Sequence, residues 1–165
     1  MIEILKTLTP TARKEHRCMF CGSVIPVGER YRRDTIKYDG DVYDWICHED
    51  CVKVAHLLDM YDNVDDGLDG CMFQEYLSEY LYEHYVGKGE EDLPERIWNM
   101  TNIERVRMVI ADWDKPSFKI PRLRNMIAKE RLFNGDGGRY LAILEDRLKE
   151  LEDGAVEGIP ERTKI

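Results

Sequence analysis

The chain has no run of about eighteen apolar residues, the length that a membrane-spanning helix requires. Its first residues, Met1 to Lys6, lack the long apolar stretch and the small-residue cleavage site of a secretory signal. Only 6 prolines accompany 43% hydrophobic residues, and this balance excludes wholesale disorder. We therefore expect a globular protein that is located in the cytoplasm and makes no contact with membranes.

The chain also lacks any spacing pattern that indicates a catalytic set. No Ser-His-Asp arrangement and no paired carboxylates follow from the sequence. The glycine-rich segment 134–138 is not followed by the Lys-Ser/Thr of a phosphate loop. An enzyme with an unrecognised site in the C-terminal half stays open as a third hypothesis, after two kinds of binding protein.

Basic residues are fewer than acidic ones, 24 against 33, and the two kinds are unevenly distributed along the chain. The net charge is −9, but residues 1–37 carry eight Lys/Arg against four Asp/Glu and are basic. The remaining residues carry the acidic excess. Such a body repels nucleic acid at long range, whereas the basic segment retains the charge that phosphate binding needs.

The cysteines predict a metal site. Four of the 5 lie between positions 18 and 51, and only Cys71 stands apart. Cys18-x-x-Cys21-Gly22 and His48-x-x-Cys51 form two pairs with the spacing of tetrahedral zinc ligands. All four positions would be filled by protein atoms, three of them thiolates, so we expect one structural Zn²⁺ rather than a catalytic one. Its removal is expected to unfold residues 15–55.

Cys47 is the alternative to His48 as the fourth ligand, because Cys47-x-x-x-Cys51 is also an acceptable spacing. We prefer His48 because a two-residue gap at the start of a helix is the commoner arrangement. Adjacent residues on a strand point to opposite sides, so Cys47 would then face elsewhere.

Local patterns predict an α+β fold. Asp39-Gly40 between two segments rich in β-branched and aromatic residues indicates a β-hairpin, which folds the two ligand pairs together. Apolar residues recur at helical spacing from Asp50 onward, again over 71–86, and in a stripe from Ile97 to Trp113. Lys115-Pro116-Ser117 is expected to interrupt this stripe, with Pro121 in the first turn of a further helix that continues through Phe133.

The last predicted helix, 139–152, carries leucines 141, 144, 148 and 151 at helical spacing. This stripe packs on the other helices or pairs in a dimer. We expect a zinc module with a β-hairpin and a following helix over residues 1–61, a domain of four or five helices over 62–153, and a disordered tail over 154–165.

Residues 11–55 resemble a known class of zinc module. Cys18-x-x-Cys21, Ile25-Pro26-x-Gly28, Trp45 and His48-x-x-Cys51 resemble the poly(ADP-ribose) polymerase-type zinc finger, and they are similar to uncharacterised zinc-knuckle proteins of bacteria and phages. The resemblance implies a treble-clef-like fold. It also implies that basic residues contact the phosphates of broken DNA while apolar residues stack on exposed base pairs.

Two binding functions follow from these patterns. The first is a protein–protein adaptor or inhibitor, whose acidic helical surface occupies a basic site on a protein partner. The second is nucleic-acid binding through a basic segment with interleaved tyrosines. The candidate contacts of that segment are Arg13, Lys14, Arg17, Arg30, Arg32, Arg33 and Lys37.

Overall fold

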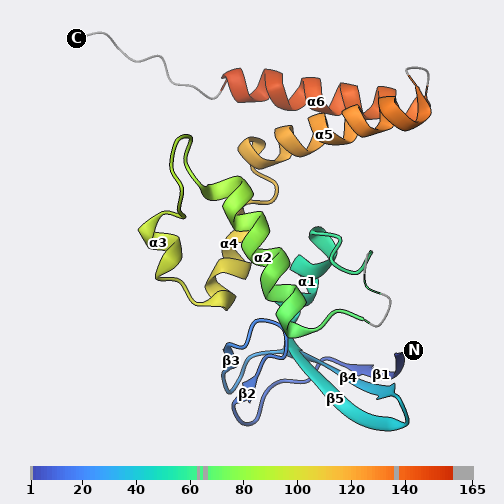
Figure 1. The fold of residues 1–165 in the computed structure, drawn as a ribbon, viewed down its shortest axis with the longest axis vertical. Helices are drawn as coiled ribbons and strands as arrows, with labels where there is room; N and C mark the ends of the chain where they lie inside the picture. The colour runs from blue at the N-terminus through green and yellow to red at the C-terminus, as the bar shows by residue number, and fades with distance from the viewer. Residues whose placement is uncertain (1, 63, 65–66, 136–137, 158–165) are drawn as a thin grey trace. The chain divides into compact units, whose positions relative to one another are not determined.

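The structure is a computed structural model that describes residues 2–62, 64, 67–135 and 138–157. It confirms the predicted α+β class: short antiparallel strands come first and helices follow (Figure 1). The chain forms two compact units, residues 1–110 and 111–165. Among the described residues, no helix combines the length and the apolar character needed to cross a membrane.

A three-stranded antiparallel sheet lies at the N-terminal end of the first unit. Its strand order is β1-β4-β5, with β1 (Glu3–Leu8), β4 (Tyr31–Tyr38) and β5 (Asp41–His48). The predicted turn joins β4 to β5, and both Asp39 and Gly40 have positive φ, as that two-residue turn requires. The register pairs Tyr38 with Asp41 at the turn and Tyr31 with His48 at the far end. The hairpin therefore delivers His48 to the base of the sheet.

A second, two-stranded ribbon pairs β2 (His16–Arg17) with β3 (Val24–Ile25). The loop between these strands carries Cys18 and Cys21. Helix α1 (Glu49–Leu57) starts directly after β5. The ribbon, the end of the hairpin and the start of α1 are thus the three elements that meet at the cysteines.

Helices α2 (Gly70–Tyr85), α3 (Glu95–Trp98) and α4 (Asn102–Asp112) complete the first unit. The predicted apolar stripe from Ile97 to Trp113 is divided between α3 and α4, with the break at residues 99–101. The core of these helices consists of fully buried apolar side chains, namely Phe73, Leu77, Leu81, Ile97, Val106 and Val109. Of the tyrosines on α2, Tyr82 is exposed and Tyr76 is half-buried, because Phe73 and the leucines occupy the inward face.

Helices beyond residue 61 contact the cysteine-bearing loop within the first unit. Phe73 of α2 stacks on Phe20 of the cysteine-bearing loop, with ring centroids 4.9 Å apart. Asn102 of α4 donates a hydrogen bond to the Cys21 carbonyl at 3.0 Å. Helices far along the chain therefore belong to the same compact unit as the cysteines.

The second unit is a helical hairpin of α5 (Pro116–Asn134) and α6 (Arg139–Glu157). The expected interruption near Pro116 lies between α4, which ends at Asp112, and α5, which begins at Pro116. The expected place of Pro121 is wrong: Pro116 occupies the first turn of α5, where its missing N–H is not needed, and Pro121 lies inside the helix. Helix α6 also extends to Glu157, so residues 154–157 of the predicted tail are helical. The rest of that tail, 158–165, lies outside the described residues.

Gly70 illustrates how closely α2 approaches the cysteine loop. A Cβ at Gly70 would collide with the backbone carbonyl oxygen of Met19. Since neither backbone segment yields easily, we expect Gly70→Ala to destabilise the protein by roughly 1–3 kcal/mol. The matched control is Gly154→Ala on α6, where the added methyl meets open space and should stabilise the helix by about 1 kcal/mol. Chemical denaturation of both variants measures the two effects, and equal stabilities would contradict the close approach.

Candidate metal centre

Four potential ligands converge from three elements. Cys18 and Cys21 lie on the loop between β2 and β3, His48 ends β5, and Cys51 lies in the first turn of α1. The loop turns back on itself because Gly22 adopts a φ of 73° and donates its N–H to the Cys18 carbonyl at 3.0 Å. The Cys18 N–H in turn donates to the Ser23 carbonyl at 2.9 Å. This tight turn aims both sulfurs at the same point.

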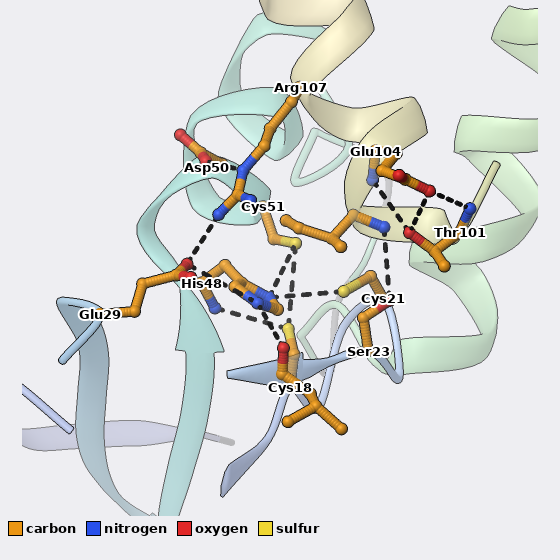
Figure 2. Close-up of polar contacts among 12 residues, drawn as sticks. Cys18, Cys21, Ser23, Glu29, His48, Asp50, Cys51, Thr101, Glu104 and Arg107 are labelled. Carbon is orange, nitrogen blue, oxygen red and sulfur yellow. Dashed lines mark hydrogen bonds and ion pairs between the residues drawn. The ribbon is translucent and has the colours of Figure 1, made fainter. Parts of the chain in front are cut away.

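The four potential ligand atoms all lie within 4.8 Å of one another (Figure 2). A tetrahedral zinc with bonds of about 2.3 Å to sulfur and about 2.0 Å to nitrogen separates two sulfurs by about 3.8 Å and a sulfur from a nitrogen by about 3.5 Å. The Cys18 and Cys51 sulfurs are 3.8 Å apart. His48 Nδ1 lies 3.5 Å from the Cys21 sulfur and 3.9 Å from the Cys51 sulfur. The four groups are thus compatible with a single metal site.

The four side chains of this cluster are buried and in contact, so any charge on them is costly in free energy without a counter-ion. All four residues are buried, with at most 2% of each exposed. The pKa of the Cys21 thiol is lowered because Cys18 and Cys51 hydrogen-bond to its sulfur. Burial lowers the pKa of His48, but contacts with the Cys18 and Cys21 sulfurs outweigh it and raise that pKa to about 10. The pKa of the Cys51 thiol is raised instead, by its hydrogen bonds with Cys18 and Cys21 and by its burial. Three thiolates held this close together would need a cation at their centre.

Cys47 does not join the cluster. It precedes His48 on β5, where adjacent side chains leave opposite faces of the strand. Its sulfur is absent from the group of atoms that lie within 4.8 Å of one another. Burial raises the pKa of the Cys47 thiol, which keeps it neutral. Of the two predicted alternatives, the geometry brings His48 to the three other ligands.

A ring of outer contacts orients His48. Its Nε2 lies 3.3 Å from the Val24 carbonyl oxygen and 3.8 Å from a carboxylate oxygen of Glu29. Arg107 of α4 donates to Glu29 at 2.7 Å and to Asp50 at 2.9 Å (Figure 2). Such outer groups fix which ring nitrogen faces the metal. Here they leave Nδ1 pointing at the sulfurs.

Helix α4 is also fastened to the cysteine loop at its first turn. Thr101 and Glu104 cap the helix reciprocally: the Thr101 N–H donates to Glu104 at 2.7 Å, and the Glu104 N–H donates to the Thr101 hydroxyl at 3.4 Å. The cap places the Ile103 N–H 3.3 Å from the Ser23 hydroxyl, which accepts its hydrogen bond. Sequence reasoning missed these supports, since nothing local links Ser23 to residues about eighty positions later.

Three of the seven predicted nucleic-acid contacts lie within ion-pair distance of carboxylates. Arg32 and Arg33 are neighbours on β4 and pair with different carboxylates, Arg32 with Asp34 at 2.7 Å and Arg33 with Asp44. Arg30 lies 3.7 Å from Glu49. The four remaining candidates are exposed, namely Arg13, Lys14, Arg17 and Lys37. The Arg17 guanidinium donates a hydrogen bond to the Gly22 carbonyl oxygen.

Comparison of the chain with models of protein families, with curated proteins and with solved structures found no significant match. The resemblance of residues 11–55 to the poly(ADP-ribose) polymerase-type finger therefore stays a prediction. What the centre does has to be argued from its own geometry.

The assignment of His48 over Cys47 has a direct test. We expect His48→Ala to lose the metal at least about tenfold more readily than the parent in a chelator competition, because one corner of the tetrahedron disappears. Cys47→Ala is the matched control: it removes the neighbouring buried thiol and should retain the parent's metal content and affinity. Metal loss in Cys47→Ala, with retention in His48→Ala, would assign the site to the other residue.

Proposed function

We propose that Cys18, Cys21, His48 and Cys51 hold one zinc ion whose role is structural. The observation that supports this proposal is the buried set of three sulfurs and one imidazole nitrogen, which all lie within 4.8 Å of one another. Sulfur-rich sets of this kind favour zinc over magnesium or calcium, which prefer oxygen. A catalytic zinc keeps one position open for water, and four protein ligands leave none.

We further propose that the zinc-stabilised unit acts by binding a protein. Strand β1 is an edge of the three-stranded sheet, and its Ile4, Leu5 and Leu8 are each more than 40% exposed. Beside it lies a cleft of 570 Å³, whose walls include Ile4, Tyr43 and Trp45. An unpaired strand edge next to an apolar cleft suits an extended peptide segment that adds to the sheet and inserts a side chain.

Nucleic-acid binding is the second candidate function, and the exposed Arg13, Lys14 and Arg17 favour it. The ion pairs of Arg32 and Arg33 count against it, because phosphate would have to displace Asp34 and Asp44. Fluorescence anisotropy with intact, nicked and single-stranded DNA at two salt concentrations tests whether the chain binds nucleic acid. Tight binding that weakens steeply with salt and is lost in the Arg13→Ala/Lys14→Ala/Arg17→Ala variant would favour this candidate over the protein-binding one.

Site-specific photo-crosslinking in the source cells tests the protein-binding proposal. A photoreactive amino acid replaces Leu5 on the β1 edge, and the matched control places it at Lys88, an exposed loop position. We expect a discrete protein adduct from position 5 that is absent from position 88 and disappears when Cys51→Ser removes a zinc ligand. No adduct, the same adduct from both positions, or an adduct with nucleic acid would contradict the proposal.

A further inference from the structure

The cleft beside β1 is lined on one side by a face of the three-stranded sheet. Alternate residues of a strand share a face, so β4 contributes Arg32, Asp34 and Ile36 to it. The register of the hairpin sets Trp45 of β5 directly across from Asp34. The volume of the cleft, 570 Å³, lies within the range of about 300–1,000 Å³ that is typical of small-molecule sites.

Aromatic side chains line the cleft from two parts of the fold. Tyr43 and Trp45 come from the sheet, and His56 and Tyr61 come from α1 and the residues after it. The rings of His56 and Tyr61 lie 4.9 Å apart. Trp45 meets the buried Phe20 edge-on with centroids 5.5 Å apart, which fixes its position. These rings favour a ligand with a flat aromatic body, which gains ring contacts as well as burial.

Of the charged side chains in the described part of the cleft, Arg32 has hydrogen-bond donors to spare. The Asp34 carboxylate accepts from the Thr7 hydroxyl at 2.6 Å and from Arg32 Nε at 2.7 Å. The Asp69 carboxylate accepts from the Met72 N–H at 2.8 Å as the N-cap of α2. The two terminal nitrogens of Arg32 have no hydrogen-bond partner among the residues that the structure describes. With 28% of its side chain exposed, Arg32 is accessible to a ligand.

The free end of the Arg32 guanidinium selects a ligand with one negative charge. Its two terminal nitrogens present parallel N–H groups, which a carboxylate accepts with both oxygens. A cation would face this guanidinium and would compete with it for Asp34. A phosphate monoester carries about −1.5 to −2 charges, which is more than one guanidinium beside a carboxylate balances.

We propose that this cleft binds a small molecule with a flat aromatic body and one carboxylate group, in which Arg32 binds the carboxylate and Tyr43 and Trp45 contact the body. The site goes beyond the proposed function, because its ligand is a small molecule and not a protein. The ligand occupies the space offered to a side chain of the protein partner, so the two compete for the cleft. Ligand binding is measured on the purified chain without a partner, so either proposal can fail while the other stands.

NMR titration of the zinc-loaded full chain with four naphthalene probes tests the class of ligand. The probes are 2-naphthoate, 2-naphthamide, 2-naphthyl phosphate and 2-naphthyltrimethylammonium, which share the aromatic body and differ in charge. We expect naphthoate to shift the indole N–H signal of Trp45, which is identified by its loss in Trp45→Phe. Naphthoate should bind about tenfold or more tightly than the amide, because only the carboxylate makes a charge-assisted bidentate contact.

Three results of this titration would overturn the proposal. The first is an amide that binds as tightly as naphthoate, which would leave no role for the guanidinium. The second is a phosphate or a cation that binds more tightly than naphthoate. The third is a Trp45 signal that none of the probes shifts.

Arg32→Gln tests the residue assigned to the carboxylate, and Arg33→Gln is the matched control. The two arginines are adjacent on β4, each pairs with a carboxylate, and their side chains leave opposite faces of the sheet. We expect Arg32→Gln to abolish the preference for naphthoate over the amide and Arg33→Gln to retain it. Zinc content and the dispersion of the amide signals show whether each variant is folded. A preference that survives Arg32→Gln would contradict the assignment.

Tyr43→Ala keeps the proposal testable if Arg32→Gln does not fold. Tyr43 is 38% exposed, so its truncation should leave the fold intact. We expect the variant to bind naphthoate about threefold or more weakly, through the lost ring contact, and to retain the preference for naphthoate over the amide. Tyr82→Ala, which truncates an equally exposed tyrosine on α2, should bind as the parent does. Equal binding by the two tyrosine variants would place the probe outside the cleft.

Discussion

Removing the metal from the full chain is expected to unfold the whole first unit, and not only the residues around the cysteines. Zinc binding in such modules supplies roughly 10–16 kcal/mol of apparent free energy, which is as large as the entire stability of a typical domain, about 5–15 kcal/mol. Helices α2 and α4 contact the cysteine-bearing loop through Phe20, Ser23 and the Cys21 carbonyl. Without a folded loop they lose these contacts and part of their core.

Hydrogen exchange followed by mass spectrometry, before and after a strong chelator, measures this effect. We expect protection to fall throughout the strands and throughout α2 and α4, and to return when zinc is added back. Cys71→Ser is the control, because Cys71 is exposed and stands apart from the cluster, and it should respond as the parent does. Persistent protection of α2 and α4 in the metal-free chain would show that the helices fold independently of the loop.

The second large effect is expected from Phe73→Ala. Phe73 is fully buried and stacks on Phe20, whose ring also meets Trp45 edge-on with centroids 5.5 Å apart. Truncation leaves a cavity at the junction of α2, the cysteine loop and β5. We therefore expect a loss of about 3–5 kcal/mol in the free energy of unfolding.

Urea denaturation of the zinc-loaded protein measures that loss. Tyr82→Ala is the matched control, because Tyr82 lies on the same helix with 38% of its surface exposed. It should cost less than about 1 kcal/mol. If both substitutions cost the same, the aromatic junction does not hold α2 to the loop, and the account of the first unit is wrong.

The clustering of Cys18, Cys21, His48 and Cys51 could be predicted from sequence because its determinants are local. Cys18 and Cys21 are placed by one tight turn, and His48 and Cys51 by the end of a strand and the first turn of a helix. The Asp39-Gly40 turn between them is equally local, since two consecutive residues with positive φ define it. The same period of two along β5 that favoured His48 over Cys47 is seen in the structure.

The contacts that surround the site could not be predicted in the same way. Arg107 lies about sixty residues beyond His48, and no spacing rule connects a helix surface to Glu29 and Asp50. The role of the basic segment could not be assigned from spacing for the same reason, because the pairing of Arg33 with Asp44 depends on the register of β4 and β5. Pro121 was misplaced because its ring suits a first turn, whereas Pro116 already occupies the first turn of α5.

X-ray absorption spectroscopy at the zinc edge, on the purified full chain, tests the central claim most directly. The account predicts one zinc per chain, with three sulfur neighbours at about 2.3 Å, one nitrogen neighbour at about 2.0 Å, and no bound water. Four sulfur neighbours would place Cys47 at the metal instead of His48. An oxygen neighbour would indicate an open, catalytic position, and a chain purified without metal and with its cysteines oxidised would contradict the metal centre itself.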